Sequence, residues 1–70
     1  MEKPNYRANM ELIKDYFPDV ALLTINQTAK FLNVSQRTIY RLIDRGELRC
    51  VETGSNFKRI SVTDLANWLS

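Results

Sequence analysis

Residues 23–48 contain two short helical patterns separated by a tight turn, and this pair restricts the fold more than any other part of the chain. Thr24 is a good N-cap for the first pattern, and Gln27 three residues later completes a capping box. Asn33 follows the last apolar residue of this pattern, and asparagine tolerates the left-handed conformation that ends a helix. Because Ser35 is a second N-cap, the sequence predicts a helix-turn-helix.

The second helix of the pair is expected to bury one face and to expose another. Ile39, Leu42 and Ile43 recur at helical spacing and should point inward, and Gly46 ends the pattern. The remaining positions have side chains suited to base edges and phosphates, namely Gln36, Arg37, Thr38, Tyr40, Arg41 and Asp44. Recognition helices contact bases chiefly through their N-terminal residues. An ordinary solvated helix face can have the same composition, so this face alone does not decide the function.

The distribution of charge favours a polyanionic partner. The net charge is only +2, but residues 1–21 have three basic and four acidic residues, whereas residues 22–70 have seven basic and four acidic residues. Six of those seven basic residues lie in the second helix of the pair or after it. Such clustering is typical of a surface that binds nucleic acid. Because the excess is small, one copy is expected to bind with modest affinity.

Length and composition indicate one small domain. Seventy residues are close to the size at which a single core is only marginally stabilising. No stretch approaches the roughly 18 apolar residues of a membrane span, and residues 1–10 lack the apolar segment of a signal peptide, so we expect a cytoplasmic location. Cys50 cannot form an internal disulfide, which fits a reducing compartment, and its apolar neighbours predict a buried structural thiol.

Residues 1–21 are expected to form an amphipathic helix and a lead-in to the DNA-binding domain of residues 22–70. The apolar residues recur at spacings of three and four, with two more that widen the face: Tyr6, Met10, Ile13 and Phe17, then Leu12 and Tyr16. Pro18 should end this helix. The face either covers the domain's own core or is a docking surface for another protein, because large exposed apolar patches mark interaction sites.

Short extended segments are expected on both sides of the helix pair. Residues 20–23 form a brief apolar run before it. After Gly46 the apolar spacing changes, and residues 48–50 and 57–60 predict two strands joined by the turn-forming residues 53–56. A small polar tip with basic flanks is typical of a wing, which lies along a DNA backbone or enters a minor groove. A plain solvated hairpin is the other interpretation.

The last residues predict a final helix. Ser61 and Asp64 have the spacing of another capping box. Leu65, Trp68 and Leu69 share one face of the helix that follows. Trp68 is expected to anchor this helix across the sheet as part of the core.

The residues most often needed for catalysis or metal binding are scarce. The chain has no histidine, a single cysteine and two glycines. It therefore lacks the commonest general base, the ligand set of a zinc site and a glycine-rich phosphate loop. We expect a protein that is not an enzyme and that needs no cofactor, metal or small-molecule ligand.

Residues 23–70 resemble the small excisionase-type DNA-binding proteins, whose fold is related to the MerR family. The most specific matching segments are Val34-Ser35, residues 38–43 (TIYRLI), residues 45–48 (RGEL) and Arg59-Ile60. The resemblance implies a mainly α fold with a small β-hairpin, a winged helix-turn-helix of the MerR-like kind with an extra N-terminal helix. It implies DNA contacts from the recognition helix and the wing, at Gln36, Arg37, Thr38, Tyr40, Arg41, Ser55, Asn56, Lys58 and Arg59.

The chain departs from the family pattern at several positions. Asn26 and Gln27 replace an acidic pair, Asn33 replaces a glycine, and Ser61 replaces a proline. The wing, residues 54–57, is one residue longer than usual, so its contacts are the part of the resemblance that transfers least directly.

The function implied by the resemblance is that of an excisionase, a recombination directionality factor of a mobile element. Such a protein binds and bends attachment-site DNA and helps a recombinase to excise the element. The implied partners are double-stranded DNA, a site-specific recombinase (integrase) and neighbouring copies on the DNA. The sequence leaves open a small phage- or element-encoded transcriptional regulator. A protein-interaction module on a winged-helix scaffold is an alternative of another class.

Overall fold

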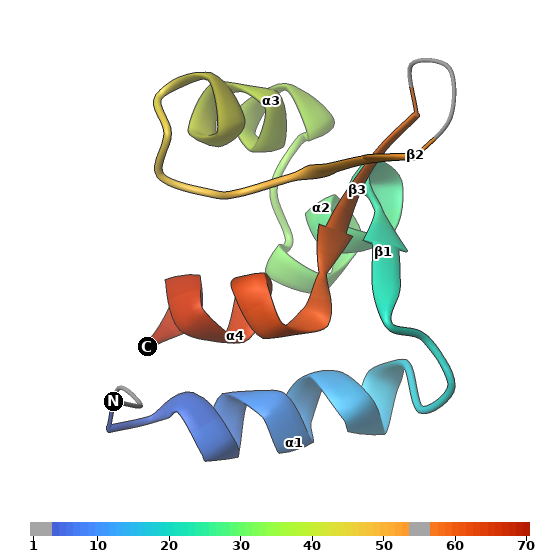
Figure 1. Ribbon diagram of the computed structural model, residues 1–70, viewed down its shortest axis with the longest axis vertical. Helices are drawn as coiled ribbons and strands as arrows, with labels where there is room; N and C mark the ends of the chain where they lie inside the picture. Colours follow the sequence, from blue (N-terminus) through green and yellow to red (C-terminus); the bar gives the residue numbers. More distant parts are fainter. Residues whose placement is uncertain (1–3, 54–56) are drawn as a thin grey trace.

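The computed structural model, which describes residues 4–53 and 57–70, has the winged helix-turn-helix fold predicted from the sequence (Figure 1). The elements in chain order are α1 (Tyr6–Tyr16), β1 (Leu22–Thr24), α2 (Ile25–Leu32), α3 (Gln36–Asp44), β2 (Val51–Thr53), β3 (Phe57–Ser61) and α4 (Val62–Leu69). Helices α2 and α3 form the helix-turn-helix, and β2 and β3 form the hairpin after it. The expected fold class, mainly α with an additional N-terminal helix, is confirmed.

The sheet has one strand more than the sequence predicted. Its order is β1-β3-β2 with antiparallel pairing throughout, and Leu23 of β1 lies opposite Ile60 of β3. The run before the helix pair was expected only to be extended, so its pairing with β3 is new. The strand expected at residues 48–50 is wrong, because β2 begins at Val51. Leu48 instead follows α3 into the core, where 2% of its surface stays exposed.

The core lies between the sheet and the helices. Five elements each contribute a side chain with no exposed surface, namely Ile13 from α1, Leu23 from β1, Ile39 from α3, Ile60 from β3 and Leu65 from α4. Helix α2 adds Thr28 and Ala29. Full burial of one aliphatic side chain contributes about 1.5–3 kcal/mol. Helix α3 is therefore held in place by a core that includes residues from both the first and the last helix.

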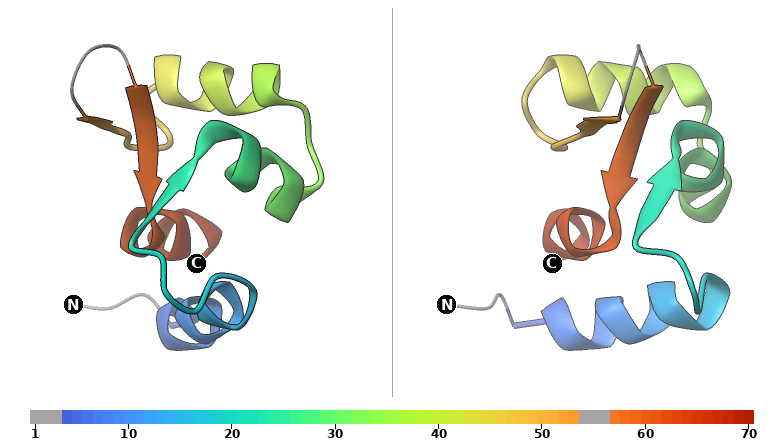
Figure 2. Two further views of the ribbon diagram at one scale, coloured as in Figure 1. Left: turned by 90° about the vertical axis from the view of Figure 1, so that its right-hand side faces the viewer. Right: turned by 45° about the vertical axis from the view of Figure 1, so that its right-hand side comes forward.

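Helix α1 packs against α4, the last helix (Figure 2). Besides the buried Ile13, the Asn9 amide donates a hydrogen bond to the Ser70 hydroxyl at 3.1 Å. The Ser70 hydroxyl in turn donates to the carbonyl oxygen of Ala66 at 2.7 Å. One face of α1 therefore covers the domain's own core, which is the first of the two interpretations of this helix.

Trp68 does not anchor α4 as expected. Its side chain is 37% exposed, whereas Leu65 and Ala66 on the same helix have no exposed surface. These smaller residues face the sheet and α1, and they leave the indole at the edge of the domain. The prediction that Trp68 is part of the core and anchors α4 across the sheet is wrong.

The helix ends form as the sequence predicted, with one difference at α4. Thr24 and Gln27 make the full capping box of α2, with both hydrogen bonds present. Ser35 caps α3. At α4 the Ser61 hydroxyl accepts from the Asp64 N–H at 3.0 Å and donates to the Asp64 carboxylate at 2.8 Å. The Asp64 carboxylate therefore accepts its hydrogen bond from the Ser61 hydroxyl, whereas in a capping box it would accept one from the Ser61 backbone N–H.

Asn33 ends α2 in the left-handed conformation, with φ 58° and ψ 46°. We expect Asn33→Val to lower the free energy of unfolding by roughly 1–2 kcal/mol, because a β-branched side chain is strained in this region. Asn33→Gly is the matched control, since glycine adopts this conformation without strain. Urea unfolding of the parent and both variants measures the difference. A valine variant as stable as the glycine variant would contradict the role of this residue in the turn.

Candidate nucleic-acid interface

Helix α3 buries one side and exposes the other, in the orientation predicted from its sequence. Ile39 has no exposed surface, and Leu42 and Ile43 are half-buried against the core. The side chains exposed to solvent are those of Gln36, Arg37, Tyr40, Arg41 and Asp44. The domain therefore presents a polar helix face with two arginines and one aspartate, and apolar contacts support this face from behind.

A shallow groove of about 320 Å³ runs along this face. It is lined by Arg37, Tyr40, Arg41, Asp44 and Arg45. Arg37 and Arg41 lie one helical turn apart, and each guanidinium is a planar fork that matches a phosphate or the edge of a guanine. Arg45 forms an ion pair with Glu47 at 3.1 Å (Nε to Oε2), but both side chains are well exposed. Such a surface pair contributes little to stability.

Two side chains at the start of α3 already have partners within the protein. The Thr38 hydroxyl lies 3.0 Å from the Ser35 hydroxyl, and the Thr38 N–H donates to that same Ser35 oxygen at 3.2 Å. The Gln36 amide donates to the Asn26 side-chain oxygen at 3.1 Å, which links the N-terminal ends of α2 and α3. These contacts fix the N-terminal end of α3, the end that carries base contacts in helix-turn-helix complexes.

Strand β3 brings one basic residue of the hairpin, Lys58, close to α3. The Lys58 ammonium lies 5.8 Å from the centre of the Tyr40 ring, within the range of a cation–π interaction. The Arg59 guanidinium lies 5.5 Å from the centre of the Phe57 ring and donates to the Lys58 carbonyl oxygen at 3.1 Å. Lys58 therefore faces α3, while Arg59 lies along its own strand.

The remaining wing residues predicted from the sequence, Ser55 and Asn56, lie outside the described ranges. The described part brings together Lys58 and Tyr40, and it places Gln36, Arg37 and Arg41 on the adjoining face of α3. Helix α3 and the hairpin lie at one end of the molecule, and α1 lies at the other (Figures 1 and 2).

A comparison of the sequence with protein families gives the same assignment as the arrangement of α2, α3 and the hairpin. Residues 22–70 match the helix-turn-helix domain family. The chain belongs to this family. The match begins with the first residue of β1 and runs to Ser70, so it includes the whole sheet and α4 as well as the helix pair.

Two curated relatives of this helix-turn-helix protein come from Mycobacterium tuberculosis, strains CDC 1551/Oshkosh and H37Rv. Each is named "putative DNA-binding protein" and is 43% identical to the chain over 37 residues. The matched segment covers 53% of this chain and 47% of each relative, about half of either length. No solved structure gives a significant match to the chain.

Sequence reasoning missed one aromatic side chain of the helix-turn-helix protein's hairpin, Phe57, and one contact of a residue that it did propose, Tyr40. Phe57 was not a candidate, although its ring is 59% exposed and lies beside the Arg59 guanidinium. The spacing of Phe57 and Arg59 could have predicted this contact, because residues two apart in a strand point to the same face of the sheet. Tyr40 was a candidate only as a DNA contact, and its proximity to Lys58 depends on the packing of β3 near α3, which no local pattern encodes.

In the described parts of the helix-turn-helix protein, no helix has the length and apolar character needed to cross a membrane.

Proposed function

We propose that this helix-turn-helix protein binds double-stranded DNA, with α3 in the major groove and the β2–β3 hairpin against the adjoining backbone or minor groove. The observation that carries the proposal is the exposed face of α3, where Arg37 and Arg41 lie one turn apart and Tyr40 lies beside Lys58 of the hairpin. Membership of the helix-turn-helix family and the names of the two relatives support it.

The contacts divide by position. Gln36 and Arg37 are at the start of α3, so they are assigned to base edges. Arg41 is one turn further along, which suits a contact to the phosphate backbone. The Tyr40 ring supports the Lys58 ammonium so that it faces the same backbone. The other proposed contacts are Thr38 on α3 and Ser55, Asn56 and Arg59 on the wing.

The proposed role of DNA binding is that of an excisionase. The support is the resemblance of residues 23–70 to the excisionase-type proteins, together with the small size of the domain. One such domain contacts little DNA, so several copies on adjacent sites are needed for a stable complex. A recognition helix and a wing that engage neighbouring grooves favour bent DNA. The bent site would then bring a recombinase into its excisive arrangement, and the recombinase would cut and join the strands.

A DNA-binding titration tests the proposal. We expect the protein to bind attachment-site DNA of its element at least about 100-fold more tightly than a random duplex of equal length, since specific affinity typically exceeds non-specific affinity by 10³ or more. The logarithm of the binding constant should fall linearly with the logarithm of salt concentration, with a slope of about −0.9 per phosphate contacted. Fluorescence anisotropy between 50 and about 200 mM salt measures both quantities.

The same titration separates the alternatives. Preferential binding to a promoter of the element, with no preference for the attachment site, would identify a transcriptional regulator and reject the excisionase role. Equal binding to every duplex would contradict sequence-specific recognition. Failure to bind any duplex at low salt would contradict the DNA-binding function itself. A circular-permutation assay on the preferred site then measures whether the DNA is bent.

A further inference from the structure

The first residue of α3, Gln36, is held by a side chain from the first turn of α2. Its Nε2 donates a hydrogen bond to the Oδ1 oxygen of Asn26 at 3.1 Å. Both side chains are exposed to solvent, so the contact lies on the surface of the domain and not in its core. The proposed function assigns Gln36 to a base edge and gives Asn26 no role. The contact therefore links a proposed reader of bases to a residue that the proposed function does not use.

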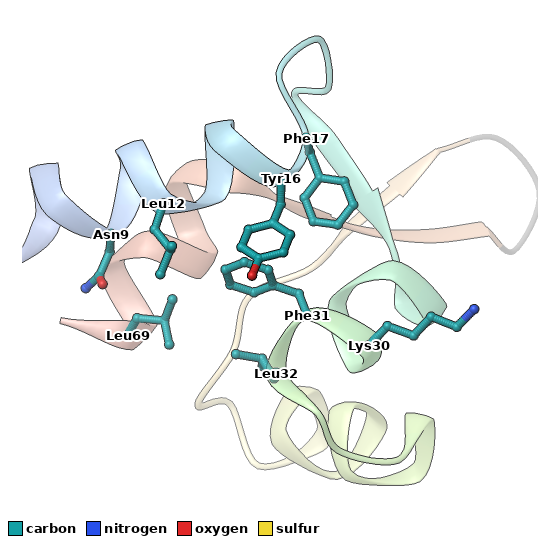
Figure 3. Close-up of a pocket in the computed structure, with 8 residues that line it drawn as sticks. All are labelled: Asn9, Leu12, Tyr16, Phe17, Lys30, Phe31, Leu32 and Leu69. Carbon is teal, nitrogen blue, oxygen red and sulfur yellow. The ribbon is translucent and has the colours of Figure 1, made fainter.

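Helix α2 gives Asn26 a fixed position. At the start of the helix, the Thr28 hydroxyl is buried and donates to the carbonyl oxygen of the N-cap residue, Thr24, at 2.9 Å. At its C-terminal end, the Phe31 ring is set edge-on against the Tyr16 ring of α1, with 5.3 Å between centres and 81° between planes. These two rings line an apolar groove (Figure 3). Asn26 therefore belongs to a helix that is anchored at both ends, and such a support can hold a flexible side chain in place.

The contact restricts Gln36 before any DNA is bound. A glutamine side chain has several rotatable bonds, and an exposed one loses much of its rotamer freedom when it binds a ligand. Part of that freedom is already lost in the free protein, because the amide is bonded to Asn26. Less conformational entropy is then lost on binding, which favours the complexes that use the amide in this orientation.

The contact also decides which hydrogen-bonding groups Gln36 has left. A glutamine amide has two N–H donors and one oxygen acceptor. Asn26 accepts from one of the donors, and within residues 4–53 and 57–70 no other hydrogen bond involves this amide. One N–H and the Oε1 oxygen therefore remain available to a base.

We propose that Asn26 is a positioning residue that makes Gln36 a reader of adenine in the major groove. Adenine is the only base whose major-groove edge offers an acceptor, N7, beside a donor, the N6 amino group. The remaining N–H of Gln36 donates to N7, and Oε1 accepts from the amino group. The inference rests on the proposed function, since it requires the start of α3 to face base edges.

The same hydrogen-bonding pattern disfavours guanine. Guanine presents two acceptors in the major groove, N7 and O6. An unrestrained glutamine can direct both N–H groups toward them, whereas Gln36 bonded to Asn26 has one N–H left and its Oε1 would face an acceptor. Two acceptors that face each other without a donor are unfavourable once water is excluded. Asn26 therefore contributes to specificity without touching a base.

Selection from duplexes with a randomised centre tests the inference. Sequencing of the bound fraction gives the site that the parent prefers, and anisotropy titrations on single-base variants of that site give the affinity for each base. The position read by Gln36 is the one whose preference is lost in Gln36→Ala. At this position we expect the parent to bind adenine about tenfold or more tightly than guanine.

Asn26→Ala should reduce this adenine-to-guanine ratio at least about threefold, the effect expected when one flexible side chain must be ordered on binding. Preferences at the other positions should not change. In a Gln36→Ala background the same substitution should have no effect on the ratio, because the residue that Asn26 positions is absent. A loss of affinity that is equal on all duplexes would instead identify a phosphate contact from Asn26 and overturn the inference.

Asn26→Asp is the matched control. The carboxylate keeps an oxygen acceptor at the same place, so the adenine-to-guanine ratio should stay within about twofold of the parent's. The added negative charge should weaken binding to every duplex alike. Alanine and aspartate both suit the first turn of a helix, so both variants should fold, which circular dichroism melting checks.

A measurement without DNA tests the positioning itself. NMR relaxation of the Gln36 side-chain amide reports its motion on the picosecond to nanosecond timescale. Its order parameter should fall in Asn26→Ala and stay near the parent value in Asn26→Asp. The buffer must contain a reductant, since Cys50 is a partly exposed free thiol that can cross-link two chains. An amide that is as mobile in the parent as in Asn26→Ala would overturn the inference.

The outcomes separate this inference from the proposed function. A parent that binds no duplex would overturn both. A parent that selects a site but prefers guanine at the position read by Gln36 would overturn the inference alone. The same holds for an Asn26→Ala protein that keeps the full adenine preference, since DNA binding by α3 would stand in either case.

Discussion

The double variant Arg37→Ala, Arg41→Ala is expected to bind specific DNA about 100-fold or more weakly than the parent, with an unfolding temperature within about 2 °C of it. Each arginine that contacts a base or phosphate contributes roughly 1–3 kcal/mol, and 1.4 kcal/mol corresponds to a factor of ten in affinity. Both side chains are exposed, so their removal is expected to leave the fold unchanged. Fluorescence anisotropy on specific and random duplexes measures the loss.

The single variants assign a role to each arginine. Loss of a phosphate contact should weaken binding to every duplex alike and make the salt slope shallower by about one. Loss of a base contact should instead reduce the preference for the specific site. The matched control is Arg7→Ala, Lys14→Ala, which removes the same charge from α1 at the other end of the molecule. A double variant of α3 that binds as well as the parent would show that α3 is not the recognition helix.

Ile13→Ala is expected to give the largest loss of stability that we predict. Ile13 has no exposed surface and is part of the core, so its truncation leaves a cavity between α1 and α4. Losses for such changes are about 2–5 kcal/mol. In a domain of this size each kcal/mol lowers the unfolding temperature by roughly 4–8 °C, so we expect a fall of more than about 10 °C. Thermal and urea unfolding measure it.

The neighbouring residue provides the control for this variant. Leu12→Ala removes a similar side chain from the same helix, but Leu12 is 47% exposed and should cost less than about 1 kcal/mol. Equal losses for the two variants would mean that α1 does not pack as described. A two-step unfolding curve for the parent would mean that α1 opens independently of the remaining domain.

Local chemistry explains why the helices could be predicted from the sequence. Thr24, Ser35 and Ser61 each accept a hydrogen bond from a backbone N–H within the first turn of the following helix. Asn33 adopts the left-handed conformation at the end of α2. These hydrogen bonds and backbone conformations involve residues only three or four apart, so they can be predicted from the local sequence.

Contacts between distant segments explain what could not be predicted. Strand β1 has three residues, too few for an alternating pattern, and it exists because β3 lies beside it. Trp68 was placed in the core by its size, but the smaller Leu65 and Ala66 fill that space. In the candidate interface the orientation of α3 followed from its periodicity. The proximity of Lys58 to Tyr40 did not, because it depends on where β3 passes the helix.

The order of the sheet has a consequence for how the chain reaches its native state. The central strand, β3, comes late in the sequence and pairs with β1, which precedes the helix pair. Pairs so far apart in sequence form only after a large loop has closed, which slows folding. Helix α1, made first, likewise waits for α4, its packing partner. During synthesis the core shared by Ile39 of α3 and Leu65 of α4 is therefore complete only after α4 has left the ribosome.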